Sequence, residues 1–340
     1  MLREILIIGA GNIFQTSHLP CFSNLGITIA GVVEPSTAVV NDLKKILPAN
    51  TSYYTTIAEV DLSKIKYALV ASPAGFHYNL IKELAKFNIH ILCEKPIAIT
   101  AAQANELYEI YTTNKGSLQI GFQRRFYPTN IFIKKLIADK TYGNLSHINI
   151  WGGWNAKGKL PQSILNKAVS GGGIMLDYGV HFTDTLLYWS NGIELVDYFD
   201  DNHGGIEVNA VSVFKLKLNQ FVQPAAKAYY SWTNQMSNTI QLWFDDAMII
   251  SGVNNPTVLE VVRINNQIID TRKVLTRETI DVSGTGYKGA VTAQWDEFFQ
   301  KAEGTLTTPP ISNLKDAVTA VNITEECYSL RKELTFNWGY

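Results

Sequence analysis

Cysteine is scarce in this 340-residue sequence, and the few cysteines follow no functional spacing. Cys21, Cys93 and Cys327 are odd in number, far apart and outside any Cys-x-x-Cys pattern. They predict neither a disulfide framework nor a zinc knuckle and are typical of a reducing compartment, so we expect a cytoplasmic protein. No metal site is expected, because four histidines have no partner at metal-ligand spacing: His18, His90, His147 and His203.

Long apolar runs and an excess of one charge are also missing. No stretch approaches the ~18 consecutive apolar residues that span a bilayer. The short run Ile5–Ile8 ends in glycines and not in a small-residue cleavage site, which favours a strand over a signal peptide. The formal net charge is −1 and Lys and Arg are scattered, so neither nucleic acid nor a membrane is an expected partner. We expect a small-molecule partner instead.

The composition is that of a folded protein with more than one core. Hydrophobic residues make up 46% of the sequence and charged residues 17%, which fits globular domains and argues against disorder. The chain is longer than the roughly 100–200 residues typical of one domain. We therefore expect two domains, divided after residue 121, although one or three domains stay open at this point.

Short β-branched runs alternate with helical periodicity through residues 1–121. Capping residues stand where helices should begin, at Ser36 and Thr100. This alternation predicts parallel strands joined by crossover helices, a doubly wound α/β domain. The expected strands are Glu4–Ile8, Ile27–Val33, Tyr67–Ala71, His90–Cys93 and Ser117–Gly121, and the expected helices are Ile13–Asn24, Thr37–Ile46, His77–Phe87 and Ala101–Asn114.

Residues 122–340 have a different sequence pattern, in which long strand-like runs are separated by turn signals. Such a succession predicts an α+β domain built on a large, mostly antiparallel open sheet. The last helix, about 314–334, carries an apolar stripe that we expect to pack back on the first domain. The expected strands are His147–Trp151, Val208–Leu218, Ala225–Thr233, Thr239–Phe244, Thr257–Ile264 and Gln267–Val274, and the expected helices are Asn130–Asp139, Ile174–Trp189, Gly289–Ala302 and Leu314–Leu334.

A glycine pattern follows the first expected strand and points to a dinucleotide. Gly9 and Gly11 are the first two glycines of a GxGxxx sequence, while Phe14 replaces the third. The first glycine allows a tight turn, and the second lets the backbone approach a pyrophosphate at the positive end of the next helix. We expect a Rossmann-type domain in which these glycines, with Asn12 and Ile13, bind the dinucleotide. A GxG turn alone is also typical of ordinary strand-to-helix connections.

An acidic residue at the end of the second expected strand sets the cofactor preference. Glu34 can accept hydrogen bonds from both ribose hydroxyls of adenosine. It would repel a 2′-phosphate, and Pro35–Thr37 supplies no Arg or Lys to bind one. NAD is therefore expected rather than NADP. A glutamate after a strand is by itself often a solvated loop residue, but its place after Gly9 and Gly11 favours the binding role.

Four further segments carry a resemblance to a known family. They read SPAGFH over Ser72–His77, EKP over Glu94–Pro96, GFQRRF over Gly121–Phe126 and GGGIMLDYGVH over Gly171–His181. In this order they resemble the signatures of the Gfo/Idh/MocA family, named for glucose-fructose oxidoreductase, inositol dehydrogenase and rhizopine catabolism. The resemblance extends by motif to about residue 190 and beyond it only by domain pattern.

The resemblance implies an NAD-dependent oxidoreductase that acts on a CH–OH group of a sugar, cyclitol or nucleotide-linked sugar. Family members often pair through the open face of the second-domain sheet, so it also implies a homodimer or homotetramer. The cofactor site that it implies adds a further set of residues: Ser72, Pro73, His77, Glu94, Lys95, Pro96 and Arg125.

Three residues form an expected acid–base set. Lys95 follows the fourth strand, at the sheet edge where open α/β sheets bind their ligands. Asp177 and His181 stand four apart on an expected helix and so share one face. The glycines 171–173 let the backbone pass close to something bulky, which suits a helix that faces a ligand. His181 is expected to take the alcohol proton, Lys95 to stabilise the alkoxide and Asp177 to hold the imidazole and a neighbouring hydroxyl.

An aromatic and a polar residue between these motifs are expected to border the substrate. Trp154 offers an apolar face to a sugar ring, although core packing is the alternative for a tryptophan. A surface position is the alternative for Arg124 or Arg125. The expected substrate contacts are Lys95, Arg125, Trp154, Asn155, Asp177 and His181.

Two other functions are known for proteins of this family. Some relatives retain NAD and use it transiently to cleave or epimerise glycosides. The same fold serves as a transcriptional regulator in one relative, so a non-enzymatic dinucleotide sensor is a further alternative. The presence of Lys95, Asp177 and His181 together argues against a purely sensory role. Whether NAD is released at each turnover stays open at this point.

Overall fold

The computed structural model describes residues 3–202, 205–269, 272–282, 284 and 286–335. Contacts between residues divide the chain into two compact units. Unit 1 comprises Met1–Gln123, Ala168–Gly171 and Val291–Val321, and unit 2 comprises Arg124–Lys167, Gly172–Ala290 and Asn322–Tyr340. Among the described residues, every helix is too short or too polar to cross a membrane.

Unit 1 is built on a six-stranded parallel sheet with the strand order β3-β2-β1-β4-β5-β6. The order reverses between β1 and β4, where doubly wound sheets open a crevice at the carboxyl ends of their strands. The prediction of a parallel α/β domain is therefore confirmed. The strands are β1 (Arg3–Ile8), β2 (Ile27–Val33), β3 (Tyr53–Tyr54), β4 (Tyr67–Val70), β5 (His90–Cys93) and β6 (Leu118–Ile120).

Two helices of unit 1 begin at the expected caps. The side chain of Ser36 accepts a hydrogen bond from the Val39 amide, and that of Thr100 accepts one from the Gln103 amide. The helix expected over Ile13–Asn24 is instead a π-helical turn, η1, followed by α1. The helical segments are η1 (Phe14–His18), α1 (Leu19–Leu25), α2 (Thr37–Leu43), η2 (Ile57–Glu59), η3 (Leu62–Lys64), η4 (Ala74–Phe76), α3 (His77–Ala85) and α4 (Ala101–Thr113).

A late segment of the chain completes the core of unit 1. Helix α9 (Gly286–Glu303) brings Trp295, Phe298 and Phe299 into a buried cluster with apolar side chains of β1, α1 and α2. Trp295 is fully buried, and its ring centroid lies 5.6 Å from that of Phe22 and 5.4 Å from that of Phe298. The sheet near the N-terminus therefore packs against residues from near the end of the chain.

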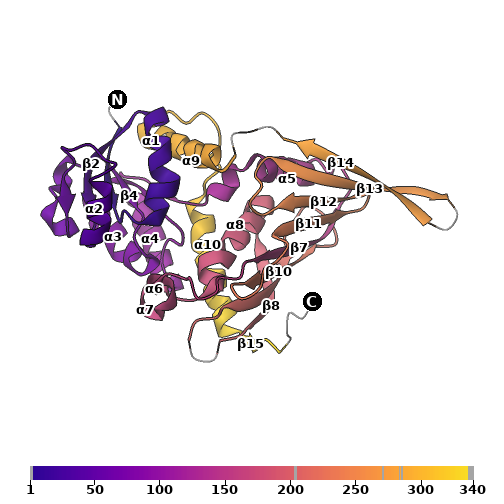
Figure 1. Ribbon diagram of the computed structural model, residues 1–340. Helices are drawn as coiled ribbons and strands as arrows, with labels where there is room; N and C mark the ends of the chain where they lie inside the picture. The colour runs from indigo at the N-terminus through magenta and orange to yellow at the C-terminus, as the bar shows by residue number, and fades with distance from the viewer. Residues whose placement is uncertain (1–2, 203–204, 270–271, 283, 285, 336–340) are drawn as a thin grey trace. The chain divides into compact units, whose positions relative to one another are not determined.

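Unit 2 is built on a nine-stranded sheet with the strand order β14-β13-β12-β11-β7-β10-β9-β8-β15. Neighbouring strands are antiparallel except for the parallel pairs β10–β7 and β15–β8, so the prediction of a mostly antiparallel sheet is confirmed. The β13–β14 hairpin extends beyond its neighbours (Figure 1). The strands are β7 (Leu145–Gly153), β8 (Ile193–Asp200), β9 (Asn209–Leu216), β10 (Ala225–Ser231), β11 (Thr239–Phe244), β12 (Ala247–Gly252), β13 (Val258–Ile269), β14 (Arg272–Asp281) and β15 (Lys332–Glu333).

The sequence pattern missed some features of this sheet. Strands β8 and β12 were not predicted. Strand β8 contains a register shift. The sequence of β12 is largely apolar, although buried and half-buried residues alternate along the strand. Two separate strands were expected over Thr257–Ile264 and Gln267–Val274. Strand β13 continues instead to Ile269, with a register shift after Asn265, because a strand irregularity can accommodate extra residues without ending the pairing.

The helix expected over Ile174–Trp189 is divided into a π-helical turn, η6, and the buried helix α8. Helices α5 and α8 lie side by side (Figure 1). The helix expected to end at Leu334 ends at Ser329, and the packing of this helix, α10, on the first domain stays a prediction. The helical segments are η5 (Gln123–Phe126), α5 (Pro128–Ala138), α6 (Gln162–Leu165), α7 (Lys167–Ser170), η6 (Met175–Gly179), α8 (Val180–Trp189) and α10 (Leu314–Ser329).

Replacing Trp295 with alanine should lower the free energy of unfolding by about 3–5 kcal/mol, because it leaves a large cavity in a close-packed core. Urea denaturation followed by circular dichroism measures the loss as an earlier transition. Phe221→Ala is the control, since that aromatic side chain is fully exposed and surface substitutions usually change stability by no more than about 0.5 kcal/mol. Equal losses in the two variants would contradict the central position of Trp295.

Candidate functional site

The turn after β1 leaves no room for a side chain at its first glycine. Gly9 has a φ of +80°, and a Cβ there would lie 2.5 Å from the amide nitrogen of Ser72. A Cβ on Gly11 would meet no described atom within 4 Å. The first glycine is therefore required by the fold, whereas the space beside the second is open to a ligand at the start of the helix.

The bulky Phe14 stands at the start of a π-helical turn. Its side chain is fully buried and meets the ring of Phe22 edge-on, with 6.0 Å between the centroids. π-Helical turns occur within helices and are frequent at functional sites. Asn12 is exposed and Ile13 is half-buried just before this turn, and their contact with a dinucleotide stays a prediction.

The carboxylate of Glu34 is held beside the glycine turn. Its Oε2 accepts a hydrogen bond from the backbone N–H of Ala10 at 2.9 Å, and its Oε1 accepts one from that of Ser36 at 2.9 Å. Hydrogen bonds from backbone donors to a carboxylate are short and directional. They orient the Glu34 side chain at the end of β2, where doubly wound domains bind the adenosine ribose.

His77 links the segments that follow two neighbouring strands, β4 and β5. Its ring nitrogens lie 2.7 Å from the carbonyl oxygens of Ser72 and Pro96, and burial lowers its pKa below the usual value. Cofactor binding by His77, Pro96 or the exposed Pro73 stays a prediction. The hydroxyl of Ser72 is buried with no hydrogen-bond partner among the described residues, and a bound ligand would give it one.

His18 belongs to a hydrogen-bonded chain that was not predicted from the sequence. The indole N–H of Trp295 donates to Nδ1 of His18 at 3.1 Å, and Nε2 lies 2.8 Å from Oε1 of Glu94. Because Nδ1 accepts, Nε2 carries the proton and donates to the carboxylate. Burial alone raises the pKa of Glu94, but the hydrogen bond from His18 and the charge of Lys95 hold that pKa below its usual value.

Lys95 directly follows this carboxylate. Its backbone N–H donates to Oε2 of Glu94 at 3.3 Å, and the Lys95–Pro96 peptide bond is cis. Gly121, which follows β6, approaches so closely that a Cβ there would lie 3.0 Å from Oε1 of Glu94. Lys95 is half-buried and follows β5 at the carboxyl edge of the sheet, where ligands of this fold bind.

In unit 2, Asp177 and His181 lie on two different kinds of helix. Asp177 belongs to the π-helical turn η6, and His181 to the first turn of α8. The π-helical turn replaces the regular α-helix expected between them, so α-helical spacing no longer determines whether their side chains share a face. His181 is buried and Asp177 is half-buried, and their joint action with Lys95 stays a prediction.

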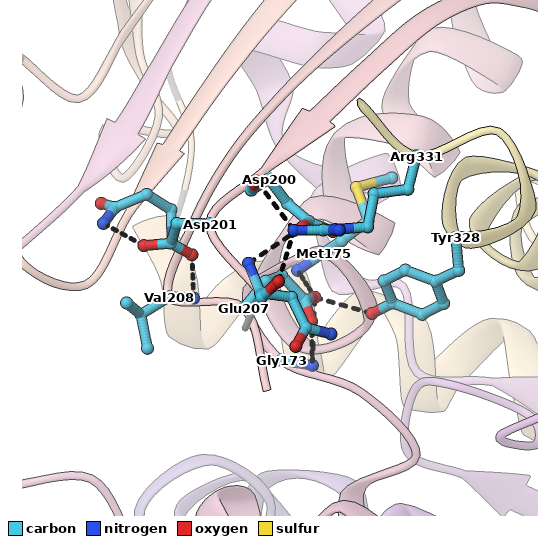
Figure 2. Close-up of polar contacts among 10 residues, drawn as sticks. Gly173, Met175, Asp200, Asp201, Glu207, Val208, Tyr328 and Arg331 are labelled. Carbon is cyan, nitrogen blue, oxygen red and sulfur yellow. Dashed lines mark hydrogen bonds and ion pairs between the residues drawn. The ribbon is translucent and has the colours of Figure 1, made fainter. Parts of the chain in front are cut away.

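Protein atoms closely surround the glycines that precede Asp177. A Cβ on Gly172 would lie 2.2 Å from the hydroxyl of Tyr328, and one on Gly173 would lie 2.0 Å from the backbone oxygen of Glu207. Figure 2 shows Gly173 with Glu207 and Tyr328. The interpretation that this run approaches a ligand is therefore corrected for these two glycines, because their close neighbours are protein groups of unit 2.

Both arginines of the GFQRRF segment are buried, so a surface position is wrong for each of them. Nε and Nη2 of Arg125 contact the carboxylate of Asp184 at 2.7 to 3.0 Å, a bidentate ion pair. The guanidinium of Arg124 lies 4.8 Å from the ring centroid of Phe182 and 5.2 Å from that of Tyr178, within cation–π distance. Ligand binding by Arg125 stays a prediction.

Trp154 keeps part of its aromatic side chain accessible. It is 37% exposed, and its ring meets that of Tyr178 edge-on with 5.3 Å between the centroids. Asn155 is exposed, and its Oδ1 accepts a hydrogen bond from the Lys157 amide at 3.1 Å. An anchored aromatic ring with accessible surface suits a sugar platform, and the contact of both residues with substrate stays a prediction.

The sheet order, the glycine turn and the oriented carboxylate after β2 together define a dinucleotide-binding unit. The part of the chain that the structure describes holds no group of three or more His, Cys, Asp or Glu able to bind a metal ion. Residues 3–122 match the oxidoreductase family with an NAD-binding Rossmann fold, and residues 131–250 match the GFO/IDH/MocA C-terminal domain. The chain therefore belongs to the Gfo/Idh/MocA oxidoreductase family, as the four sequence segments predicted.

Curated relatives include the rhizopine catabolism protein MocA of Rhizobium meliloti, 28% identical over 192 residues that cover 56% of this chain and 58% of that protein. An inositol 2-dehydrogenase of Rhizobium meliloti (strain 1021) is 26% identical over 145 residues, 42% of this chain and 43% of that protein. The similarity thus spans about half the length of these two relatives. An uncharacterized oxidoreductase of Bacillus subtilis (strain 168), YrbE, is 26% identical and covers 77% of each chain.

Solved structures of similar fold cover almost the whole chain. An oxidoreductase from Thermotoga maritima has a TM-score of 0.81 at 16% identity and covers 97% of both chains. A levoglucosan dehydrogenase in complex with NADH and levoglucosan has a TM-score of 0.77 at 16% identity, with 96% of both chains covered. A 3-ketoreductase from Actinomadura kijaniata in complex with NADP and TDP-benzene has a TM-score of 0.80 at 14% identity, with 99% of this chain and 100% of that chain covered. These likenesses show a shared fold.

The lowered pKa of Glu94 predicts a pH-dependent contribution to stability. A carboxyl group with a lower pKa in the folded state stabilises the fold above its unfolded pKa, near 4.5, and loses this contribution as the pH falls through the folded value. Glu94→Gln should therefore be less stable than wild type near neutral pH, by about 1.5–3 kcal/mol for a hydrogen bond to a charged group. Denaturation of both proteins across the acidic range should show the difference shrinking. A constant difference would contradict the lowered pKa.

Proposed function

We propose that the protein is an NAD-dependent oxidoreductase that moves a hydride between nicotinamide and a hydroxyl or keto carbon of a sugar, cyclitol or nucleotide-linked sugar. Membership in an oxidoreductase family with an NAD-binding domain supports the reaction class. The relatives named inositol 2-dehydrogenase and the levoglucosan dehydrogenase of similar fold support cyclic polyols as the substrate class.

The residues at the carboxyl edge of the unit 1 sheet fit a dinucleotide. Gly11 has open space beside it at a helix start, the hydroxyl of Ser72 has no partner among the described residues, and Glu34 presents an oriented carboxylate. When bound, NAD supplies the hydride acceptor for alcohol oxidation. In this proposal Gly11 and the following turn hold the pyrophosphate, and Glu34 holds the adenosine ribose.

Proton transfer is assigned to the chain's own side chains. His181 takes the proton of the reacting hydroxyl, because an imidazole exchanges protons near neutral pH. Lys95 donates a hydrogen bond to the same oxygen and stabilises its negative charge, an effect typically worth about 3 kcal/mol. Asp177 holds a neighbouring hydroxyl and orients the imidazole, and Trp154 lies against the apolar face of the ring.

The orientation of Glu34 is the single observation that carries the choice of NAD. The amides of Ala10 and Ser36 each bind one oxygen of its carboxylate, so turning the side chain aside would break both hydrogen bonds. A 2′-phosphate would therefore meet a fixed negative charge. Two ribose hydroxyls, in contrast, can donate to the remaining lone pairs of the same oxygens.

The half-buried face of the nine-stranded sheet supports self-association. Trp151 stacks on Tyr229, with 6.0 Å between the ring centroids and planes 1° apart. His147 stacks on Trp243 at 5.4 Å and 11°. Aromatic side chains gathered on one open sheet face are typical of a surface that another subunit covers, which is consistent with the homodimer or homotetramer expected for the family.

We predict that NAD binds more tightly than NADP, because Glu34 repels the 2′-phosphate. Calorimetric titration of both nucleotides measures the preference. Glu34→Gln should narrow it, since the amide removes the charge but keeps the shape and one oxygen acceptor. If wild type binds NADP as well as NAD, the role of Glu34 is wrong, and Lys44 or Lys45 after α2 becomes the candidate phosphate ligand.

We also predict that His181→Asn and Lys95→Ala each lower kcat by about 10²–10⁴, as expected when a general base or an alkoxide-stabilising charge is lost. A thermal-shift screen of sugars, inositols and nucleotide sugars with NAD identifies the substrate for this assay, because ligands stabilise the folded state. Glu34→Gln is the comparison, and its main effect should be a higher KM for NAD. Near-normal kcat in both His181→Asn and Lys95→Ala would contradict the mechanism.

A further inference from the structure

The helix that carries Asp177 and His181 begins with backbone groups that it cannot satisfy itself. The first N–H groups of any helix lack partners within that helix. Here three successive donors, the amides of Gly173, Ile174 and Met175, all reach one residue, Glu207. An external residue therefore caps this helix start.

The carboxylate and the backbone of Glu207 share this task. The amides of Gly173 and Met175 donate to its carboxylate at 3.0 Å, and the Ile174 amide donates to its backbone oxygen at 3.0 Å. Figure 2 shows the carboxylate beside Gly173 and Met175. A negative charge at a helix N-terminus also complements the helix dipole, so the cap is electrostatic as well as geometric.

Glu207 is itself held in place by its surroundings. It is 1% exposed, and the hydroxyl of Tyr328, on α10, donates to its Oε1 at 2.7 Å (Figure 2). Burial raises the pKa of Glu207 above its usual value, while the hydrogen bonds from Tyr328 and from the Met175 amide counteract part of that rise. A Cβ on Gly172 would clash with Tyr328 and one on Gly173 with Glu207, so both positions require glycine for this close approach.

The capped segment is short and leads directly to the proposed site. Asp177 lies two residues after the last capped amide, and its own N–H bonds to the carbonyl of Gly173 at 3.1 Å. The π-helical turn Met175–Gly179 connects it to α8 and His181. Only a few peptide units separate the cap from Asp177 and His181, so a displacement of the cap would change the positions of both side chains.

Resting on the proposed function, we propose that Glu207 is a positioning residue: with Tyr328, it fixes the helix start that sets the orientation of Asp177 and His181. Glu207 contributes no group to the chemistry. Its contribution lies in holding the acid–base pair in the geometry of the reaction, where a misplacement on the order of 1 Å can cost about 100-fold in rate.

The test uses three variants of the full-length chain and a matched control. Glu207→Gln keeps one oxygen acceptor, Glu207→Ala removes the cap, and Tyr328→Phe removes only the hydroxyl that holds the carboxylate. Glu297→Gln is the control, because Glu297 is another buried carboxylate that accepts two backbone N–H groups and one hydroxyl. It binds a turn of unit 1 that carries no proposed catalytic residue.

Two readouts separate positioning from general stability. The first is kcat against KM for NAD, and we expect kcat to fall about 10- to 100-fold in Glu207→Ala and less in Glu207→Gln and Tyr328→Phe, with KM for NAD near the wild-type value. The second is the imidazole signal and titration of His181 in long-range ¹H–¹⁵N spectra, assigned from its absence in His181→Asn. This signal should change in the Glu207 and Tyr328 variants and stay at its wild-type position in Glu297→Gln.

The second readout does not depend on any substrate. If wild type oxidises no polyol but the His181 signal moves in Glu207→Gln, the proposed function fails and the positioning role stands. If kcat and the His181 signal are unchanged in the folded Glu207→Gln and Tyr328→Phe variants, the positioning role is wrong. Equal changes in Glu297→Gln would also overturn it, because they would show a general effect of losing a buried carboxylate.

Discussion

Backbone N–H groups in a protein interior need acceptors, and carboxylates supply them at the points on which both units depend. Glu34 binds amides that follow β1 and β2, Glu207 binds those at a helix start, and Glu297 binds those of the segment just before α10. A charged acceptor gives stronger and more directional bonds than a neutral one. At Glu34 and Glu207 the bound backbone is rich in glycine, which has many accessible conformations by itself, and these contacts favour one of them.

The features that depend on neighbours in the sequence could be predicted. The Ser36 and Thr100 caps, the turn at Gly9 and the strand Thr239–Phe244 follow from local propensity and alternation, and the structure confirms each. Strand β12 could not be separated from its surroundings, because an apolar run hides the two-residue period that marks a strand with one buried face. The family could be recognised from the sequence because each of its motifs is a short contiguous segment.

The features that depend on distant partners could not be predicted. His18 gains its role from Trp295 and Glu94, and Arg125 gains its partner Asp184 from a helix far along the chain. Glu207 lies in a loop, and the sequence of this loop does not indicate that its carboxylate accepts hydrogen bonds from the distant Gly173 segment. For the candidate site, the sequence therefore indicated which residue types converge, but not the side chains that hold them in place.

The contribution of α9 to the core of unit 1 has a consequence for synthesis of the chain. The six parallel strands are synthesised long before Trp295, Phe298 and Phe299. The apolar side chains that pack against these three residues are therefore exposed to water while most of unit 2 is synthesised. Domains at the N-terminus of a chain generally fold first during translation, but this one receives part of its core near the end. The nascent sheet has to remain unaggregated, alone or with a chaperone, until the last segments emerge.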